Sequence, residues 1–88
     1  MTRICDIRWR ERVIVEGAVE RLRVRSAEFT SAMLEFELVG DDASITVVMF
    51  GFRRFAGLSL GRRVQVEGMV VGWEGRLAIL NPALELLP

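Results

Sequence analysis

RVIVEGAV, at residues 12–19, and RVQVEGMV, at residues 63–70, are identical at six of eight positions in a chain of 88 residues. In each segment, valines alternate with other residues on either side of a glycine, Gly17 or Gly68, as in a strand that buries one face. The residues that follow differ, ERLRVRS in one case and VGWEGRL in the other, whereas a duplication should preserve more similarity. We therefore interpret the repeat as two bent strands under the same geometric demand. The alternative is an ancient duplication of half a barrel.

The alternation changes phase shortly after the first of these segments. Inward-facing residues share one parity as far as Val19, whereas Leu22 and Val24 continue on the other parity. A shift of one residue inside a strand is typical of a β-bulge, which we place near Glu20–Arg21. We therefore predict one long, bent strand over residues 12–25. In a small closed barrel, a glycine or a bulge permits the sharp bends that strands must make.

Period-two alternation predicts two further strands, at residues 33–39 and 44–50, joined by the hairpin signal GDDA at residues 40–43. A polar loop, SAEFTS, precedes them at residues 26–31. The side chains expected to face the core are Leu34, Phe36, Leu38, Ile45, Val47 and Met49. The side chains expected on the opposite face are Glu35, Glu37, Thr46, Val48 and Phe50.

The alternation stops in the segment FRRFAGLSLG. Phe52 and Phe55 lie three residues apart, as on one face of a helical turn, and Gly57 is placed to close that turn. We therefore predict a short helix here. Strands follow at residues 63–71 and 76–80, with WEG as the turn between them.

The two ends of the chain are expected to lie outside the sheet. Residues 1–9 form an N-terminal segment, and Pro82 is expected to end regular pairing, so that residues 82–88 form a C-terminal tail. The predicted fold is all-β: a sandwich or a small barrel in a single domain spanning residues 1–88. One short helix is expected between strands three and four.

Composition narrows the possible functions. Twelve arginines balance twelve acidic residues, and the chain has neither lysine nor histidine. A net charge of zero argues against strong non-specific binding to nucleic acid, because such binding depends on neutralising phosphates. Cys5 is the single cysteine, which excludes an intramolecular disulfide and fits a reducing cytoplasm. No apolar run approaches the roughly 20 residues that cross a membrane, so we predict a cytoplasmic protein with no membrane partner.

Four stretches of the chain, RVIVEGAVERLRVR, SITVVMFGFRRFAGL, LGRRVQVEGMVV and GRLAILNPALELL, resemble OB-fold domains. The chain is similar to small actinobacterial OB-fold proteins of the nucleic-acid-binding type and to the OB-fold wedge domain of RecG-type helicases. The resemblance covers residues 4–87. It implies a five-stranded Greek-key OB-fold barrel with one short helix between strands three and four. It also implies a ligand face on strands two and three, flanked by the loops between strands one and two and between strands four and five. OB-folds bind single strands, structured RNA, oligosaccharides or proteins, so the resemblance leaves the ligand open.

Two aromatic side chains are candidates for stacking on bases. Single-stranded nucleic acid requires aromatic platforms for its bases and cations for its phosphates. Phe50 lies opposite the predicted core face of the third strand; its alternative is to pack under the short helix. Trp73 lies in the turn between the last two strands, where an exposed indole suits stacking; its alternative is to pack against its own hairpin.

The candidate phosphate contacts are the arginines Arg23, Arg25, Arg53 and Arg54. The first two share the outer face of the long strand where it leads into the first ligand loop, and the last two directly follow the third strand. The alternative for each pair is a solvated barrel exterior. Glu35 and Glu37 would repel phosphates from this face unless neighbouring arginines pair with them.

The sequence contains no phosphate loop, no Cys/His set with metal-ligand spacing and no Ser/His/Asp constellation. We therefore predict a protein that is not an enzyme and that has no catalytic residues, metal ligands or cofactor. The predicted function is to bind single-stranded or branched nucleic acid weakly, by aromatic stacking and arginine–phosphate contacts. The alternative is a protein-interaction module or homodimer whose apolar patch consists of Val48, Phe50, Met69 and Val71.

Overall fold

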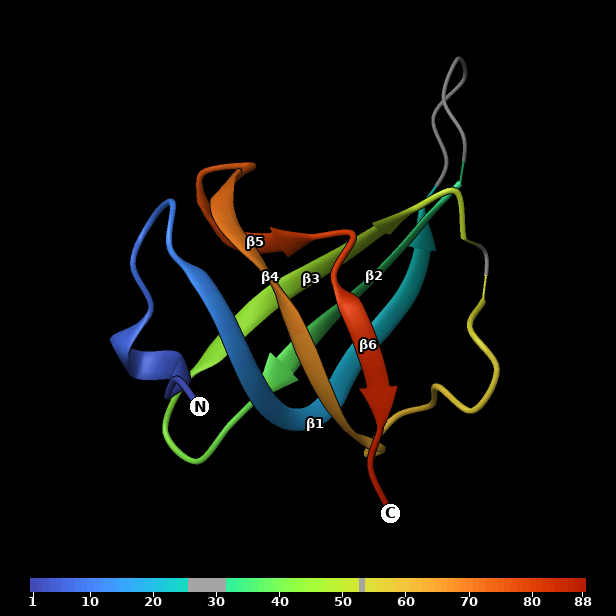
Figure 1. The fold of residues 1–88 in the computed structure, drawn as a ribbon. Coiled ribbons are helices and arrows are strands. Elements are labelled where there is room, and N and C mark those ends of the chain that lie inside the picture. The colour runs from blue at the N-terminus through green and yellow to red at the C-terminus, as the bar shows by residue number, and fades with distance from the viewer. Residues whose placement is uncertain (26–31, 53) are drawn as a thin grey trace.

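The computed structural model describes residues 1–25, 32–52 and 54–88, so the predicted loop at residues 26–31 lies outside the described residues. Six strands and one short 3-10 turn make up the regular structure of the described part (Figure 1). In chain order, these are η1 (Ile4–Asp6), β1 (Arg12–Arg25), β2 (Met33–Val39), β3 (Ser44–Phe50), β4 (Arg63–Trp73), β5 (Arg76–Leu80) and β6 (Ala83–Leu86). The fold is therefore all-β, as predicted. Within the described ranges, no helix is long and apolar enough to span a membrane.

The two similar segments lie side by side as antiparallel neighbours in β1 and β4. Val15 lies opposite Val66, and both side chains are fully buried. Glu16 lies opposite Gln65 on the other face of the ladder. The repeat therefore reflects the same geometric demand on two neighbouring strands, as predicted. In both strands the same alternation places valine side chains in the barrel interior.

The sheet closes on itself because β1 has partners on both edges. Its first half pairs with β4 and its second half with β2, and Ala18 belongs to both ladders. β2 pairs antiparallel with β3, β3 pairs parallel with β5, and β5 pairs antiparallel with β4. The result is a closed barrel with the strand order β1-β2-β3-β5-β4 (Figure 1).

Two local features let β1 serve both sides of the barrel. A Cβ on Gly17 would lie 2.6 Å from the carbonyl oxygen of Val39, so β2 can approach β1 this closely only because residue 17 is glycine. Further along, the register with β2 shifts between Glu20 and Arg23, and Arg21 adopts a φ of 51°. This shift confirms the bulge predicted near Glu20–Arg21.

The barrel interior is filled by the predicted apolar positions. All six inward positions predicted on β2 and β3 belong to the buried core cluster, together with six valines and Ile79 from the remaining strands of the barrel. The cluster comprises Val13, Val15, Val19, Leu34, Phe36, Leu38, Ile45, Val47, Met49, Val64, Val66, Val70 and Ile79. β-branched residues dominate the set, as expected for a pleated, fully buried surface.

The short helix predicted between the third and fourth strands is not formed in the described residues of this segment. Gly51, Gly57 and Gly61 all adopt positive φ angles between 82° and 84°, which interrupt any run of right-handed helical residues. The backbone instead makes tight turns, in which the N–H of Leu58 donates to the carbonyl oxygen of Phe55 at 3.0 Å. Phe55 and Leu58 still pack against the core, so the segment closes one end of the barrel without helical structure.

The prediction of a C-terminal tail at residues 82–88 was also wrong. Pro82 is buried, and pairing resumes directly after it, because Ala83–Leu86 form β6 on the free edge of β4. Leu84 lies opposite Val66, and Leu84 and Leu86 both pack against the core cluster. Proline ended only β5; its missing N–H did not prevent the next residues from forming a ladder.

Candidate functional site

The outer surface of β2 and β3 carries most of the predicted site residues, arranged in cross-strand rows. Arg25 of β1 lies opposite Met33 of β2, which lies opposite Phe50 of β3. In the next row, Arg23 lies opposite Glu35, which lies opposite Val48. We call this surface the β2–β3 face. The strand register therefore brings the predicted arginines of β1 and the predicted aromatic platform of β3 onto one surface.

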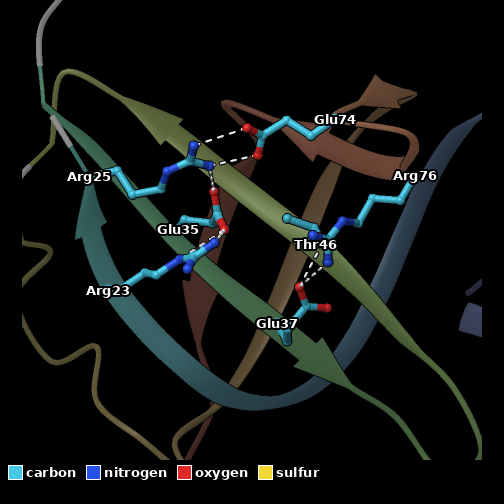
Figure 2. Close-up of polar contacts among 7 residues, drawn as sticks. All are labelled: Arg23, Arg25, Glu35, Glu37, Thr46, Glu74 and Arg76. Carbon is cyan, nitrogen blue, oxygen red and sulfur yellow. Dashed lines mark hydrogen bonds and ion pairs between the residues drawn. The ribbon is translucent and has the colours of Figure 1, made fainter. Parts of the chain in front are cut away.

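Glu35 holds both arginines of β1 (Figure 2). Its Oε1 accepts hydrogen bonds from Nε and Nη2 of Arg23 at 3.1 and 2.5 Å, and its Oε2 accepts one from Nη1 of Arg25 at 2.8 Å. Only 6% of the Glu35 side chain is exposed. Burial opposes ionisation of this carboxyl, but the hydrogen bonds from the two arginines outweigh it and hold its pKa below the ordinary value. Glu35 is therefore a buried anion on the outer face of β2, and it pairs with the two neighbouring arginines that the sequence named as its partners.

A second carboxylate reaches Arg25 from the opposite side of the face. Glu74, in the turn between β4 and β5, accepts hydrogen bonds from Nη1 and Nη2 of Arg25 at 2.7 and 2.9 Å. These bonds are the main cause of the lowered pKa of Glu74. Figure 2 shows the pair bridging from β1 to the β4–β5 turn across β2 and β3. The bridge ties the two edges of the face together.

Glu37 is neutralised by neighbours at the far end of the same face. Its Oε1 accepts a hydrogen bond from the hydroxyl of Thr46 at 2.7 Å and lies 3.6 Å from Nη1 of Arg76. Six charged residues of the face thus contact one another, namely Glu35, Glu37 and Glu74 with Arg23, Arg25 and Arg76. These six charges are paired internally, as the sequence suggested they would have to be.

The two predicted stacking residues contact each other. The rings of Phe50 and Trp73 meet edge to face, with centroids 5.4 Å apart and planes at 77°. Phe50 is 38% exposed, whereas Trp73 is partly buried and its indole N–H has no hydrogen-bond partner among the described residues. The backbone N–H of Phe50 donates to the side-chain oxygen of Asn81 at 2.7 Å, which fixes the end of β3. Phe50 therefore presents an accessible ring that Trp73 supports from the side.

Other outward positions on this face are covered. Val48 is fully buried and Thr46 is 2% exposed, although neither belongs to the interior cluster. The apolar patch predicted from Val48, Phe50, Met69 and Val71 is consequently incomplete, because Val48 is not available at the surface. Met69 is 43% exposed and Val71 is partly buried. The accessible parts of the β2–β3 face include the guanidinium edges, the carboxylate of Glu74 and the ring of Phe50.

The described residues include only one of the second pair of predicted arginines, Arg54. Arg53 lies outside the described residues. Arg54 lies at the end of the barrel, where it lines, together with Arg23, a cavity of about 260 Å³ whose other walls are Leu22, Val24, Leu34, Phe55 and Leu58. Among the described residues, no group of three or more His, Cys, Asp or Glu side chains is placed to hold a metal ion.

The sequence reasoning missed the contribution of Glu74 and Arg76. A signal was present in the turn WEGR, where a glutamate occupies a position at which type I′ hairpins favour asparagine, aspartate or glycine. Comparison with known proteins adds no further assignment, since neither a protein-family model nor a curated protein matches the chain.

Proposed function

We propose that this chain is an OB-fold module that binds single-stranded nucleic acid weakly on its β2–β3 face. The closed strand order β1-β2-β3-β5-β4 and the long β1 that serves both sides of the barrel support the OB-fold assignment. The resemblance of the sequence to OB-fold proteins of the nucleic-acid-binding type points in the same direction. Bases stack on Phe50, and the phosphate backbone passes along Arg25 and Arg23.

One observation carries this proposal: Arg25, Met33 and Phe50 form a single cross-strand row. Two strand spacings, or about 10 Å, separate the outer members of such a row. A cationic edge and an accessible aromatic ring therefore stand side by side on one surface, which is the combination that single strands require.

The paired charges imply that binding is weak and depends little on salt. When a phosphate contacts Arg25 or Arg23, the arginine exchanges its glutamate partner for the phosphate. Few counterions are therefore released overall. Stacking contributes about 1–3 kcal/mol per base, and the described face offers one well-exposed ring. We therefore expect dissociation constants of about 0.1–1 mM, which correspond to roughly 4–5 kcal/mol.

Titration with an oligothymidylate of about 15 nucleotides, at low and at physiological salt, tests this proposal. The readout is the fluorescence of Trp73 in a Trp9→Phe background, because Trp9 is 58% exposed and would otherwise dominate the signal. The variant Phe50→Ala is expected to weaken binding at least about fivefold, since one base loses its platform. The matched control is Phe52→Ala: Phe52 is 41% exposed, but its ring contacts Phe55 and it follows the end of β3.

Absence of binding at low salt refutes the proposal, and so does equal weakening by the Phe50 and Phe52 substitutions. An oligouridylate titrated in parallel distinguishes a preference for RNA from one for DNA.

A second candidate function is association of the barrel exterior with another protein or a second copy of the chain. Ile14 and Met69 are 37% and 43% exposed and lie diagonally on the outer face of the β1–β4 ladder, next to Glu67 and Arg12. Apolar side chains in adjacent outer positions are a common feature of protein interfaces. Sedimentation at micromolar concentration tests the homodimer: a mass of 10.0 kDa contradicts it, and twice that mass supports it.

A further inference from the structure

The β4–β5 turn places a glutamate where the backbone conformation disfavours one. Trp73 pairs with Arg76, which leaves Glu74 and Gly75 as the two turn residues, with φ angles of 50° and 81°. Positive φ at both positions is the type I′ geometry, which favours asparagine, aspartate or glycine at the first of them. Non-glycine residues held in this region often occur where a side chain has a function.

The carboxylate of Glu74 occupies the fork of Arg25 as a phosphate would. Both of its oxygens accept hydrogen bonds from the two terminal nitrogens of this guanidinium, at 2.7 and 2.9 Å (Figure 2). This two-point geometry is the one by which arginine recognises carboxylate and phosphate groups alike. A phosphate and Glu74 therefore compete for the same donors.

Glu35 and Glu74 differ in how readily they can leave. The Glu35 side chain is 6% exposed, and it lies within a strand and binds two arginines. The Glu74 side chain is 45% exposed, and it lies at the tip of a hairpin and contacts one of these arginines. Glu35 is suited to hold the arginines on the face permanently, whereas Glu74 can be displaced without disturbing the barrel core.

We propose that Glu74 is an internal competitor of the ligand phosphate and determines the affinity and specificity of the site. The inference rests on the proposed nucleic-acid function and assigns a role to a residue of the same face. While the Arg25–Glu74 pair is closed, it fastens the β4–β5 hairpin to β1. Only a ligand that presents two oxygens to the Arg25 fork and also stacks on Phe50 replaces the carboxylate. A neutral aromatic or a carbohydrate gains nothing by opening the pair.

The variant Glu74→Gln tests the competition, with Glu67→Gln as its matched control. Both substitutions add one unit of net charge, but Glu67 pairs with Arg12 on the β1–β4 ladder, away from the proposed site. We expect Glu74→Gln to bind oligothymidylate about three- to tenfold more tightly than Glu67→Gln. The salt dependence of its binding should also steepen by about 0.7 in log–log slope, because the Arg25–phosphate contact then releases a counterion without freeing a carboxylate.

A second readout needs no ligand. In the Trp9→Phe background, acrylamide should quench Trp73 more strongly in Glu74→Gln than in Glu67→Gln, because the hairpin is no longer fastened to β1. Tighter binding together with stronger quenching supports the inference. Stronger quenching with equal oligothymidylate affinity in the two variants refutes the competition. If no variant binds oligothymidylate, the proposed function is refuted. Equal quenching of Trp73 in Glu74→Gln and Glu67→Gln shows separately that the Arg25–Glu74 pair does not hold the hairpin.

Discussion

Gly17 is the residue of the repeated segment at which adding a single methyl group should destabilise the fold most. A Cβ there would lie 2.6 Å from the carbonyl oxygen of Val39, 2.9 Å from the carbonyl carbon of the same residue and 3.1 Å from Leu38. The first two atoms are backbone of β2 and cannot rotate away. Because β1 passes from one partner strand to the other at Ala18, separating β1 from β2 here opens the corner of the barrel.

The expected cost of Gly17→Ala follows from this geometry. Overpacking a rigid site costs about 1–3 kcal/mol, and a clash with backbone belongs at the upper end of that range. For a domain of this size, each kcal/mol lowers the melting temperature by roughly 4–8 °C. We therefore expect Gly17→Ala to lose about 3 kcal/mol and to melt roughly 12–24 °C below the unsubstituted chain.

Two other strand glycines provide graded controls. A Cβ on Gly68 would lie 2.8 Å from the γ2 methyl group of Ile79, a side-chain atom rather than backbone, so Gly68→Ala should cost about 1–2 kcal/mol, less than Gly17→Ala. A Cβ on Gly72 would meet nothing within 4 Å, so Gly72→Ala should stay within about 0.5 kcal/mol of the unsubstituted chain or be slightly stabilising. Thermal and urea unfolding of the three variants supplies the comparison. Equal stability of Gly17→Ala and Gly72→Ala would refute the explanation of the bend.

Two further predictions concern stability. Glu35 and Glu74 have lowered pKa values in the folded protein, so the stabilisation by their ion pairs is complete above the pKa of an unfolded-state carboxyl, about 4.3, and is lost as the pH falls through the lower folded values. The urea midpoint should therefore decline below about pH 4.5, and less steeply in the double variant Glu35→Gln/Glu74→Gln; an unchanged decline contradicts the pairing. Leu84→Ala should destabilise the chain by about 1–2 kcal/mol, because a partly buried core contact of β6 is lost, whereas Glu85→Ala, at an exposed position, should be nearly neutral in the same urea titration.

The barrel could be predicted from the sequence because its signals are local and periodic. Val13 and Val15 alternate with outward residues exactly as a half-buried strand requires, and the phase change after Val19 marks the bulge. Local periodicity gave a wrong prediction for the segment after β3, where it indicated a helix. Phe52 and Phe55 do approach each other, with ring centroids 6.2 Å apart, but turn geometry at the glycines achieves this as well as a helix does.

The site was harder to predict because its essential partners are distant in sequence. The pairing of Glu35 with Arg23 and Arg25 follows from the strand register. The sequence already indicated that phosphates could approach this face only if such pairs formed. The contact between Arg25 and Glu74 depends instead on how the β4–β5 hairpin bends over the face, which no alternation pattern encodes. The burial of Val48 was missed for a related reason, since a position opposite the core becomes buried only when other side chains cover it.

The most direct test of the proposed binding face is a titration of the isotope-labelled chain with oligothymidylate at low salt, followed by amide and indole NMR shifts. We expect the largest changes at Phe50 and its neighbours on β2 and β3, and at the indole N–H of Trp73, which has no hydrogen-bond partner in the described part of the chain. The β1–β4 ladder around Ile14 and Met69 should remain unaffected. Shifts confined to that ladder, or no shifts at all, would contradict the proposed interface.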